Sequence, residues 1–345
     1  MVQMTARSLF FIVFAACPVF AAFQRSLVVV PVADVRRHPG PPVVNSDEET
    51  QVLFGEAVDV IKSSGPWSYV NVPDQPKYVY ENAEFGARSA GEGVSHQNNL
   101  LPHSAFRTPH WQGYPGWVFS KSLSPESEAL KPNAIITRKW LPVTKEIGGT
   151  LWMQLPLGAR VFVFKTDHEW SLIDLGNGAQ GWALTAGMRE LTAFPKASRV
   201  RKDIIQTAEF LTGDPYLWGG RSPYDSYHPE QLSGVDCSGL VHLSYIVNGV
   251  EIPRDAMEQY MKAEKIKPAD LRPADLIFSA PLKEPGRITH VSLFAGKGWV
   301  IEAPQTGQTV RKIRFEEKFG KALDSVHPGD RLQDRVIYFG RLLKE

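Results

Sequence analysis

The stretch from Gly234 to Val241 constrains this chain most, because it holds the only cysteine beyond the first two dozen residues. Turn-forming residues precede Cys237, and apolar residues follow it at the spacing of one helix face, which predicts Cys237 on the first turn of a helix. Free backbone N–H groups and the positive dipole end there favour a thiolate, the nucleophilic form of cysteine. The alternative is that Cys237 is a small core hydrophobe.

The start of the chain is typical of an export signal. A positive residue, a short apolar core and the cleavage pattern Val19-Phe20-Ala21 predict a signal peptide at residues 1–21. An alternative is a bacterial lipoprotein box that ends at Cys17 and would leave this cysteine as a lipid anchor. We favour simple cleavage, because the residue before the alanines of such a box is usually Leu. Either way, Cys237 remains as an unpaired thiol in a compartment where unused thiols are a liability.

Composition excludes several classes of protein. The net charge of +1 gives no support for nucleic-acid binding, and the apolar segment at the start is too short for a comfortable membrane span. Two cysteines cannot form a disulfide framework. Because no Cys-x-x-Cys or His-x-x-x-His pair occurs, we expect no metal and no cofactor. A monomer is the default expectation.

Residues 26 to about 190 contain a weak internal repeat. The parallel segments are Gly55–Val60 with Gly158–Val163, Trp67–Val70 with Trp170–Ile173, and Gly116–Val118 with Gly181–Ala183. Short alternating strands between turn residues predict two small antiparallel barrels, at 26–125 and 130–192. The Gly-Trp-Val element resembles the late strand of bacterial SH3-like domains. The first barrel carries an insertion at about 73–112, which is either a functional loop or a plain surface excursion.

The pattern changes at about residue 200. One helical face of apolar residues runs to Leu211, and the cysteine helix follows it. The strands that we expect next lie at 275–280, 288–295, 299–303, 309–313 and 336–341. Helices followed by an antiparallel sheet predict an α+β domain at 200–345.

A cysteine nucleophile needs a base, and His290 is the best placed of the nine histidines. It lies on an otherwise apolar strand, and the tight turn Gly296-Lys297-Gly298 leads into a second strand that carries Glu302. In such a hairpin Glu302 can lie near His290, fix its tautomer and support its imidazolium form. The alternative is a buried, satisfied histidine with a surface glutamate nearby.

Several motifs together resemble the NlpC-type cell-wall cysteine peptidases, which have a reduced papain-like fold. The motifs, in the order and at the spacing of that family, are Tyr216-Leu217-Trp218-Gly219-Gly220, Asp236-Cys237-Ser238-Gly239-Leu240-Val241, Ile252-Pro253-Arg254, Pro273–Phe278 and Thr289-His290-Val291. The resemblance covers about 200–345. The upstream barrels look like the SH3-like pair in one branch of the family, the γ-D-glutamyl-L-diamino acid endopeptidases.

The resemblance implies Cys237 as the nucleophile, His290 as the general base and Glu302 as the third polar residue. Many relatives have histidine at the third position, so this chain departs from the common pattern there. The resemblance also implies substrate contacts at Asp236, at Ser238, at Tyr114 for the amine of a terminal L-alanine, and at an acidic residue for which Glu81 and Glu84 are candidates. The Tyr216 hydroxyl is a candidate to stabilise the oxyanion. A serine expected shortly after Arg254 is not evident, and Arg254 itself is either structural or functional.

We therefore expect an exported cysteine endopeptidase of the periplasm or cell envelope. It would cut the bond from γ-D-glutamate to the diamino acid (meso-diaminopimelate or lysine) in peptidoglycan stem peptides, favouring a free N-terminal L-alanine. One alternative is an N-acetylmuramoyl-L-alanine amidase or a hydrolase that remodels the intact sacculus. A second alternative is a non-catalytic protein that binds the cell wall.

Overall fold

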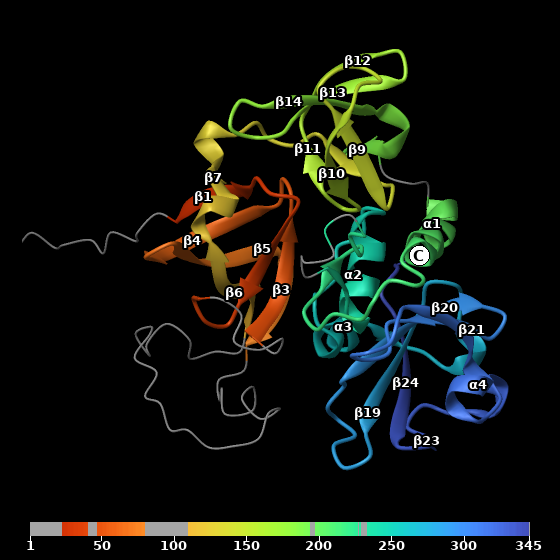
Figure 1. Cartoon of the computed structure of the whole chain (residues 1–345). Helices are drawn as coiled ribbons and strands as arrows, with labels where there is room; N and C mark the ends of the chain where they lie inside the picture. The colour runs from red at the N-terminus through yellow and green to blue at the C-terminus, as the bar shows by residue number, and fades with distance from the viewer. Residues whose placement is uncertain are drawn as a thin grey trace, which may run out of the picture.

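The computed structural model describes residues 23–40, 47–79, 110–193, 197–226, 228 and 233–344. The predicted signal peptide with Cys17, and the candidate residues Glu81 and Glu84, lie outside the described residues. Figure 1 shows a first strand-rich unit, a second strand-rich unit and a C-terminal module that contains the helices. No helix in the described part of the chain is both long and apolar enough to cross a membrane.

The first unit is a seven-stranded antiparallel sheet with the strand order β3-β2-β6-β5-β4-β1-β7. Its strands are β1 (Gln24–Val28), β2 (Val32–Arg36), β3 (Glu48–Leu53), β4 (Ala57–Ser64), β5 (Trp67–Val79), β6 (His110–Phe119) and β7 (Leu123–Pro125). The expected insertion differs at its ends, because Lys77 and Tyr78 pair with Gln112 and Trp111. The β5–β6 hairpin therefore continues through residues that we expected to form a loop.

The second unit repeats this order of elements in two smaller sheets, β10-β9-β14-β13-β12 and β11-β8-β15. The strands are β8 (Ala134–Ile136), β9 (Trp140–Thr144), β10 (Leu151–Pro156), β11 (Arg160–Val161), β12 (Val163–Asp167), β13 (Trp170–Asp174), β14 (Gln180–Leu184) and β15 (Met188–Glu190). In both units a tryptophan begins one strand, the Gly-Trp pair lies on the next, and a short 3₁₀ helix follows. The predicted repeat is confirmed at this level. Among the described residues, neither unit closes its sheet into a ring.

The C-terminal module has the predicted α+β layout. Its helices are α1 (Ala197–Phe210), α2 (Cys237–Ile246), α3 (Ala256–Lys262) and α4 (Phe315–Phe319). Its strands are β16 (Arg221–Ser222), β17 (Gly234–Val235), β18 (Glu264–Lys265), β19 (Leu276–Pro281), β20 (His290–Gly296), β21 (Trp299–Glu302), β22 (Arg311–Arg314), β23 (Arg331–Leu332) and β24 (Arg335–Arg341). The main sheet has the order β18-β24-β19-β20-β21-β22, with β23 paired to β24. The five expected strands are confirmed to within a few residues.

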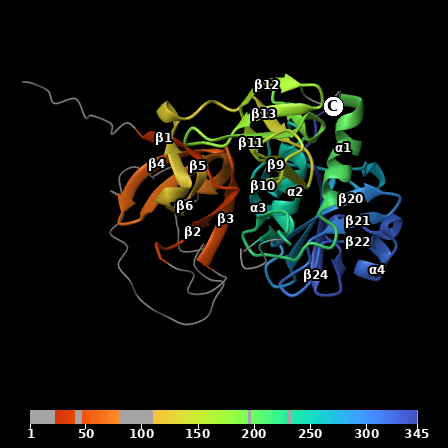
Figure 2. The same cartoon turned by 45° about the horizontal axis from the view of Figure 1, so that its top comes forward.

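Helix α2 lies at the centre of the molecule. Every residue from Cys237 to Tyr245 is buried, as expected for a mostly apolar helix inside a larger core. Its apolar residues share one core with Leu53 of the first unit and Leu157 of the second. Gly158, which follows Leu157 in the chain, lies so close to Leu243 and Leu53 that a side chain at this position would overlap them. Both N-terminal units are thus packed against the helix that begins at Cys237 (Figure 2).

Polar contacts join the first unit to the C-terminal module as well. Arg221 on β16 pairs with Glu56, and both side chains are almost completely buried. The backbone N–H of Arg221 also donates to the side chain of Gln51 at 2.9 Å. Because a buried ion pair is costly to break, the first unit is held in a fixed position beside the module.

Candidate active site

The first turn of α2 has a complete N-cap. Asp236 Oδ1 accepts the backbone N–H of Gly239 at 2.6 Å, and the Ser238 hydroxyl donates to the same oxygen at 3.2 Å. Glycine is required at 239, because a Cβ there would lie 2.2 Å from the carbonyl oxygen of Gly220. Cys237 is the first residue of the helix, so its predicted place in the fold is confirmed.

The Cys237 thiol is more enclosed than we expected. The residue is 7% exposed, and its sulfur lies near the backbone N–H of Val291, the residue after His290. Burial and the nearby Asp236 carboxylate raise the pKa of the thiol to about 12, although Arg254 and the N–H groups of Val291 and Ser238 oppose this. The helix end alone therefore does not set the charge of this thiol, because burial acts against it and raises the pKa. The resting thiolate at the helix tip stays a prediction.

His290 and Glu302 form the predicted pair. The β20–β21 hairpin pairs Leu293 with Ile301, and the His290 Nε2 atom lies 2.9 Å from Glu302 Oε2. A carboxylate only accepts hydrogen bonds, so Nε2 carries the proton and Nδ1 is the basic nitrogen. Burial lowers the pKa of His290, and Glu302 opposes this effect only in part. The imidazole is therefore neutral and able to accept a proton near pH 7.

The Glu302 carboxylate has no exposed surface and is surrounded by donors. Arg311 on β22 donates to Oε1 from Nε at 3.1 Å and from Nη2 at 2.9 Å. Lys318 on α4 donates to Oε2, the oxygen that also accepts from His290. Burial alone would raise the pKa of Glu302, but His290 and Lys318 hold it well below its usual range. Glu302 is therefore a full anion despite its burial.

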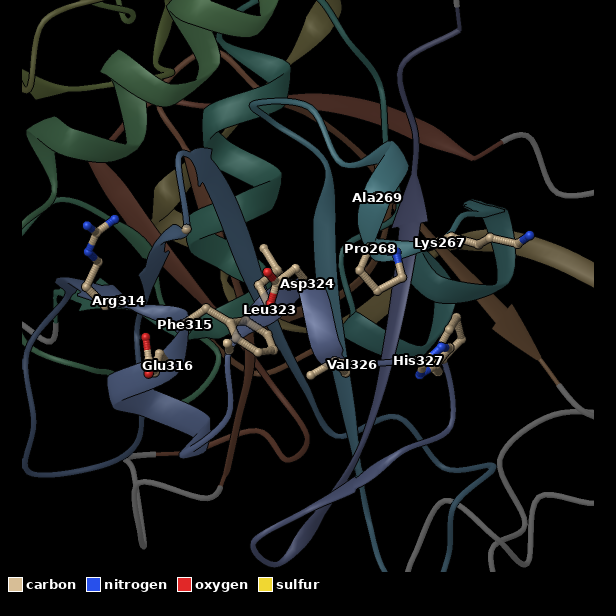
Figure 3. Close-up of a pocket in the computed structure, with 13 residues that line it drawn as sticks. Lys267, Pro268, Ala269, Arg314, Phe315, Glu316, Leu323, Asp324, Val326 and His327 are labelled. Carbon is tan, nitrogen blue, oxygen red and sulfur yellow. The ribbon is translucent and has the colours of Figure 1, made fainter.

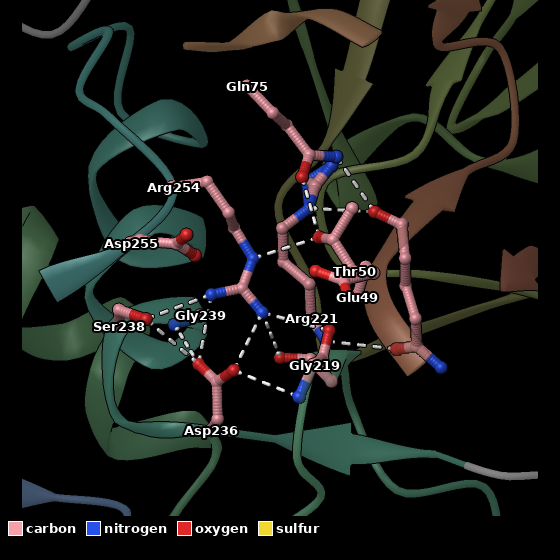
Figure 4. A network of polar contacts seen from close by, with 12 residues as sticks. Glu49, Thr50, Gln75, Gly219, Arg221, Asp236, Ser238, Gly239, Arg254 and Asp255 are labelled. Carbon is pink, nitrogen blue, oxygen red and sulfur yellow. Dashed lines mark hydrogen bonds and ion pairs between the residues drawn. The ribbon is translucent and has the colours of Figure 1, made fainter. Parts of the chain in front are cut away.

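Arg254 is the centre of a second buried network (Figure 4). Its guanidinium donates to both oxygens of Asp236 at 3.0 and 2.9 Å, to Ser238 Oγ at 3.0 Å and to the carbonyl of Gly219 at 2.8 Å. Its Nε donates to Thr50 Oγ1 on β3 at 2.9 Å. Of the two interpretations of Arg254, the structural one is therefore supported. Asp236 and Ser238, predicted to bind substrate, are both committed to this arginine, and their substrate role stays a prediction.

The buried Tyr114 side chain lies in a partly buried polar group between the first unit and α3. Its hydroxyl is 2.9 Å from Lys77 Nζ, 3.2 Å from Asp255 Oδ2 and 3.3 Å from Glu49 Oε2. Lys77 also pairs with Asp255 at 3.3 Å. Burial alone would lower the pKa of Lys77, but Asp255 and Tyr114 raise it, so the ammonium is fully charged. Sequence reasoning missed Lys77, Asp255 and Glu49, because no local pattern links them to Tyr114.

The Tyr216 side chain lies in the environment of the thiol. Burial raises its pKa, and the charges of Cys237 and Asp236 raise it further, so the hydroxyl stays protonated. Its backbone N–H donates to the carbonyl of Gln308 at 2.8 Å, which fixes the loop before the cysteine helix. Among the described residues, no three His, Cys, Asp or Glu side chains gather as a metal site.

A cavity of about 860 Å³ lies elsewhere in the C-terminal module, between α4 and two short 3₁₀ turns (Figure 3). Phe315, Leu323 and Val326 form part of its lining and belong to a different core cluster from Cys237. That cluster packs on the opposite face of the main sheet from α2. The cavity is therefore separate from the thiol.

The fold and the site together define a papain-like thiol hydrolase, with a cysteine at the start of a buried helix and a histidine–carboxylate pair on the neighbouring sheet. Comparison with known families agrees. Residues 213–325 match the model of the NlpC/P60 family. These residues form an NlpC/P60 domain, which is a cysteine peptidase domain.

Relatives extend the likeness beyond this domain. The chain is 29% identical over 279 residues to a gamma-D-glutamyl-L-lysine dipeptidyl-peptidase of Bacillus subtilis, covering 78% of this chain and 76% of that protein. It is 29% identical to dipeptidyl-peptidase 6 of Lysinibacillus sphaericus, covering 80% and 88%. The crystal structure of an NlpC/P60 family protein from Bacillus cereus superposes with a TM-score of 0.67 at 21% identity, covering 93% of this chain and all of that one. The last match shows a shared fold through the N-terminal units.

Proposed function

We propose that this protein is an exported cysteine endopeptidase that hydrolyses the γ-D-glutamyl-L-diamino acid bond of peptidoglycan stem peptides and favours a free N-terminal L-alanine. The observation that carries the proposal is the buried thiol of Cys237 beside the backbone of Val291, next to a His290 whose Nε2 is bound to Glu302. The name of the Bacillus subtilis relative supports the γ-D-glutamyl bond, and the names of the Bacillus and Lysinibacillus relatives both support the release of a dipeptide.

The proposed chemistry starts from a neutral thiol and a neutral imidazole. As the Cys237 sulfur attacks the γ-carbonyl carbon of D-glutamate, His290 Nδ1 takes the thiol proton. The negative oxygen is met by the Cys237 backbone N–H and the Tyr216 hydroxyl. Glu302 stabilises the imidazolium, which then gives its proton to the leaving amine of the diamino acid. Water, deprotonated by His290, then attacks the thioester, the carbon–sulfur bond breaks to release L-Ala-γ-D-Glu, and His290 returns the proton to the Cys237 sulfur.

The same proposal assigns roles to the rest of the chain. Residues 26–125 and 130–192 would be SH3-like modules beside a catalytic domain at 200–345, and residues 1–21 would direct export to the periplasm or cell envelope. A lipid on Cys17 is the alternative form of the mature terminus. The polar group around Tyr114 would hold the substrate amine, with Asp236 and Ser238 nearby and with Glu81 as a further acidic candidate.

The group around Tyr114 supports an amine site in one specific respect. Tyr114 and Asp255 already bind an ammonium, that of Lys77, at 2.9 and 3.3 Å. Their oxygens therefore suit an ammonium of the substrate. Because Lys77 occupies them here, a substrate amine would enter only in competition with Lys77.

The test of the proposed bond is a product analysis with L-Ala-γ-D-Glu-meso-diaminopimelate. We expect release of L-Ala-γ-D-Glu and free diaminopimelate, detected by mass spectrometry, and we expect the N-acetylated peptide to react at least tenfold more slowly, since one lost charged contact removes about that much binding. Equal rates would remove the amine preference. Release of L-alanine from muramyl peptides in place of the dipeptide would favour the amidase alternative.

Replacing Glu302 by Gln tests the proposed role of the carboxylate. The change removes the negative charge that raises the pKa of His290, so that pKa should fall further. We expect the acidic limb of kcat/KM against pH to move to lower pH, and the plateau to fall roughly tenfold to a hundredfold, because the amide oxygen still holds the tautomer but no longer supports the imidazolium. An acidic limb that stays in place or moves to higher pH would contradict this role.

A further inference from the structure

The charge balance around Glu302 is unusual for a residue that only orients a histidine. One buried carboxylate accepts from four side chains on three separate elements. They are His290 and Ser292 on β20, Arg311 on β22 and Lys318 on α4. The two cations divide the oxygens between them. Arg311 binds Oε1 through two nitrogens, and Lys318 shares Oε2 with His290.

A single buried carboxylate beside a histidine would have two undesirable states. It could take up a proton and lose its charge, or it could hold the histidine as a permanent imidazolium, which cannot act as a base. Positive charges bound to the carboxylate prevent both, because they keep the carboxylate ionised and offset its electrostatic stabilisation of the imidazolium. Arg311 and Lys318 stand where such charges are needed.

We propose that Arg311 and Lys318 are positioning residues for catalysis, which hold the Glu302 carboxylate in place as an anion and thereby keep His290 neutral with Nδ1 free. The proposal rests on the peptidase activity proposed above. Neither side chain needs to touch substrate, because both bind Glu302 and Lys318 also acts directly on the charge of His290. Lys318 should have the larger effect, since its side chain is 14% exposed whereas that of Arg311 is 44% exposed and more strongly screened by water.

The other charged groups around the pair do not replace these two. Among the described residues, the charges that act on His290 come from Glu302 on β21, Lys318 on α4 and Arg335 on β24. Arg335 donates a hydrogen bond to the hydroxyl oxygen of Thr289 at 2.9 Å. Asp236 and Arg254 act on the thiol in opposite directions and are paired with each other.

The experiment is the pH profile of kcat/KM for Lys318→Met and Arg311→Met. Removing either cation removes a charge that disfavours the imidazolium, so the pKa of His290 should rise. We expect the acidic limb to move to higher pH by about one unit for Lys318→Met and by less for Arg311→Met. A shift of one unit corresponds to a roughly tenfold loss of rate at pH values below the limb. This direction is opposite to that expected for Glu302→Gln. Lys318→Arg should keep the wild-type limb.

The strand that carries Arg311 supplies matched controls. Lys312 pairs with Glu209, and Arg314 donates to the carbonyl of Lys297, so both point away from Glu302. Lys312→Met and Arg314→Met remove the same charge from the same strand and should leave the limb in place. If they shift it as far as Lys318→Met does, a general field effect explains the data and the proposal is wrong.

A combined variant separates action through Glu302 from a structural role. In a Glu302→Gln background, Lys318→Met should shift the limb by less than in the wild type, because the part of its effect that depends on the Glu302 charge is absent. An equal shift in both backgrounds, or a lower melting temperature with an unmoved limb, overturns the proposal. The His290 ring protons titrated by NMR give the same pKa without substrate. If the tripeptide is not cleaved at all, the proposed bond fails, while this titration still tests the charge balance.

Discussion

Cys237→Ala should abolish hydrolysis of the tripeptide while leaving the fold intact. The thiol forms the proposed thioester intermediate, so we expect kcat/KM to fall by about 10⁴-fold or more without it. Alanine is a good helix former, and the lost sulfur contacts are few, so stability should change by about 1 kcal/mol or less. Product formation is measured by mass spectrometry, and the melting temperature checks the fold.

Ser244→Ala is the matched control for this variant. Ser244 lies on the same helix, is fully buried and donates only to the carbonyl of Leu240 at 2.7 Å. It should keep near-wild-type activity. If Cys237→Ala retained the wild-type products and pH profile, the hydrolysis would have to come from another group.

The state of the Cys237 thiol gives a second measurement on the same residue. With a pKa of about 12, the resting thiolate fraction near pH 7 is on the order of 10⁻⁵. Alkylation of the free enzyme by iodoacetamide should therefore be slow and should rise about tenfold per pH unit between pH 7 and 9. A fast rate that is flat above pH 5 would indicate a resting thiolate–imidazolium pair, and the sequence-based expectation would then be the right one.

The sequence predicted the parts of the site that local patterns encode. Turn residues followed by helical spacing located Cys237, and alternation with a tight turn located His290 and Glu302 on one hairpin. These features depend on neighbours in the chain, so one sequence suffices. The repeat of strand order in the two N-terminal units is of the same kind.

The rest of the site depends on tertiary contacts that no local pattern shows. Arg311 and Lys318 reach Glu302 from a strand and a short helix that follow it, and their spacing has no recognisable signature. The pKa of Cys237 could not be predicted for a related reason. The helix end is a local feature and favours the thiolate, but burial depends on elements packed from across the chain, and it raises the pKa. The strand extensions around Lys77 likewise become visible only through their pairing.

Arg254→Met should cause the largest loss of stability, about 3–5 kcal/mol in the free energy of unfolding. The side chain has no exposed surface, and its loss leaves the buried Asp236 carboxylate without its cation. It also removes the bonds to Thr50 on β3 and to the carbonyl of Gly219, so the first unit and the loop before α2 are released together. Denaturant unfolding of the full chain measures the change. Activity should fall as well, because Asp236 caps the helix that carries Cys237.

Two further variants show whether the unpaired, buried charge of Asp236 causes the loss of stability. Arg254→Lys should rescue little, since one ammonium cannot reproduce a planar guanidinium that contacts five groups. Adding Asp236→Asn to Arg254→Met should recover part of the lost stability, because an amide can still cap Gly239 and carries no buried charge. Two outcomes would contradict this role of Arg254: a stability of Arg254→Met within about 1 kcal/mol of the wild type, or a further loss of stability when Asp236→Asn is added. The buried ion pair of Arg221 with Glu56 would then have to connect the cysteine helix to the first unit.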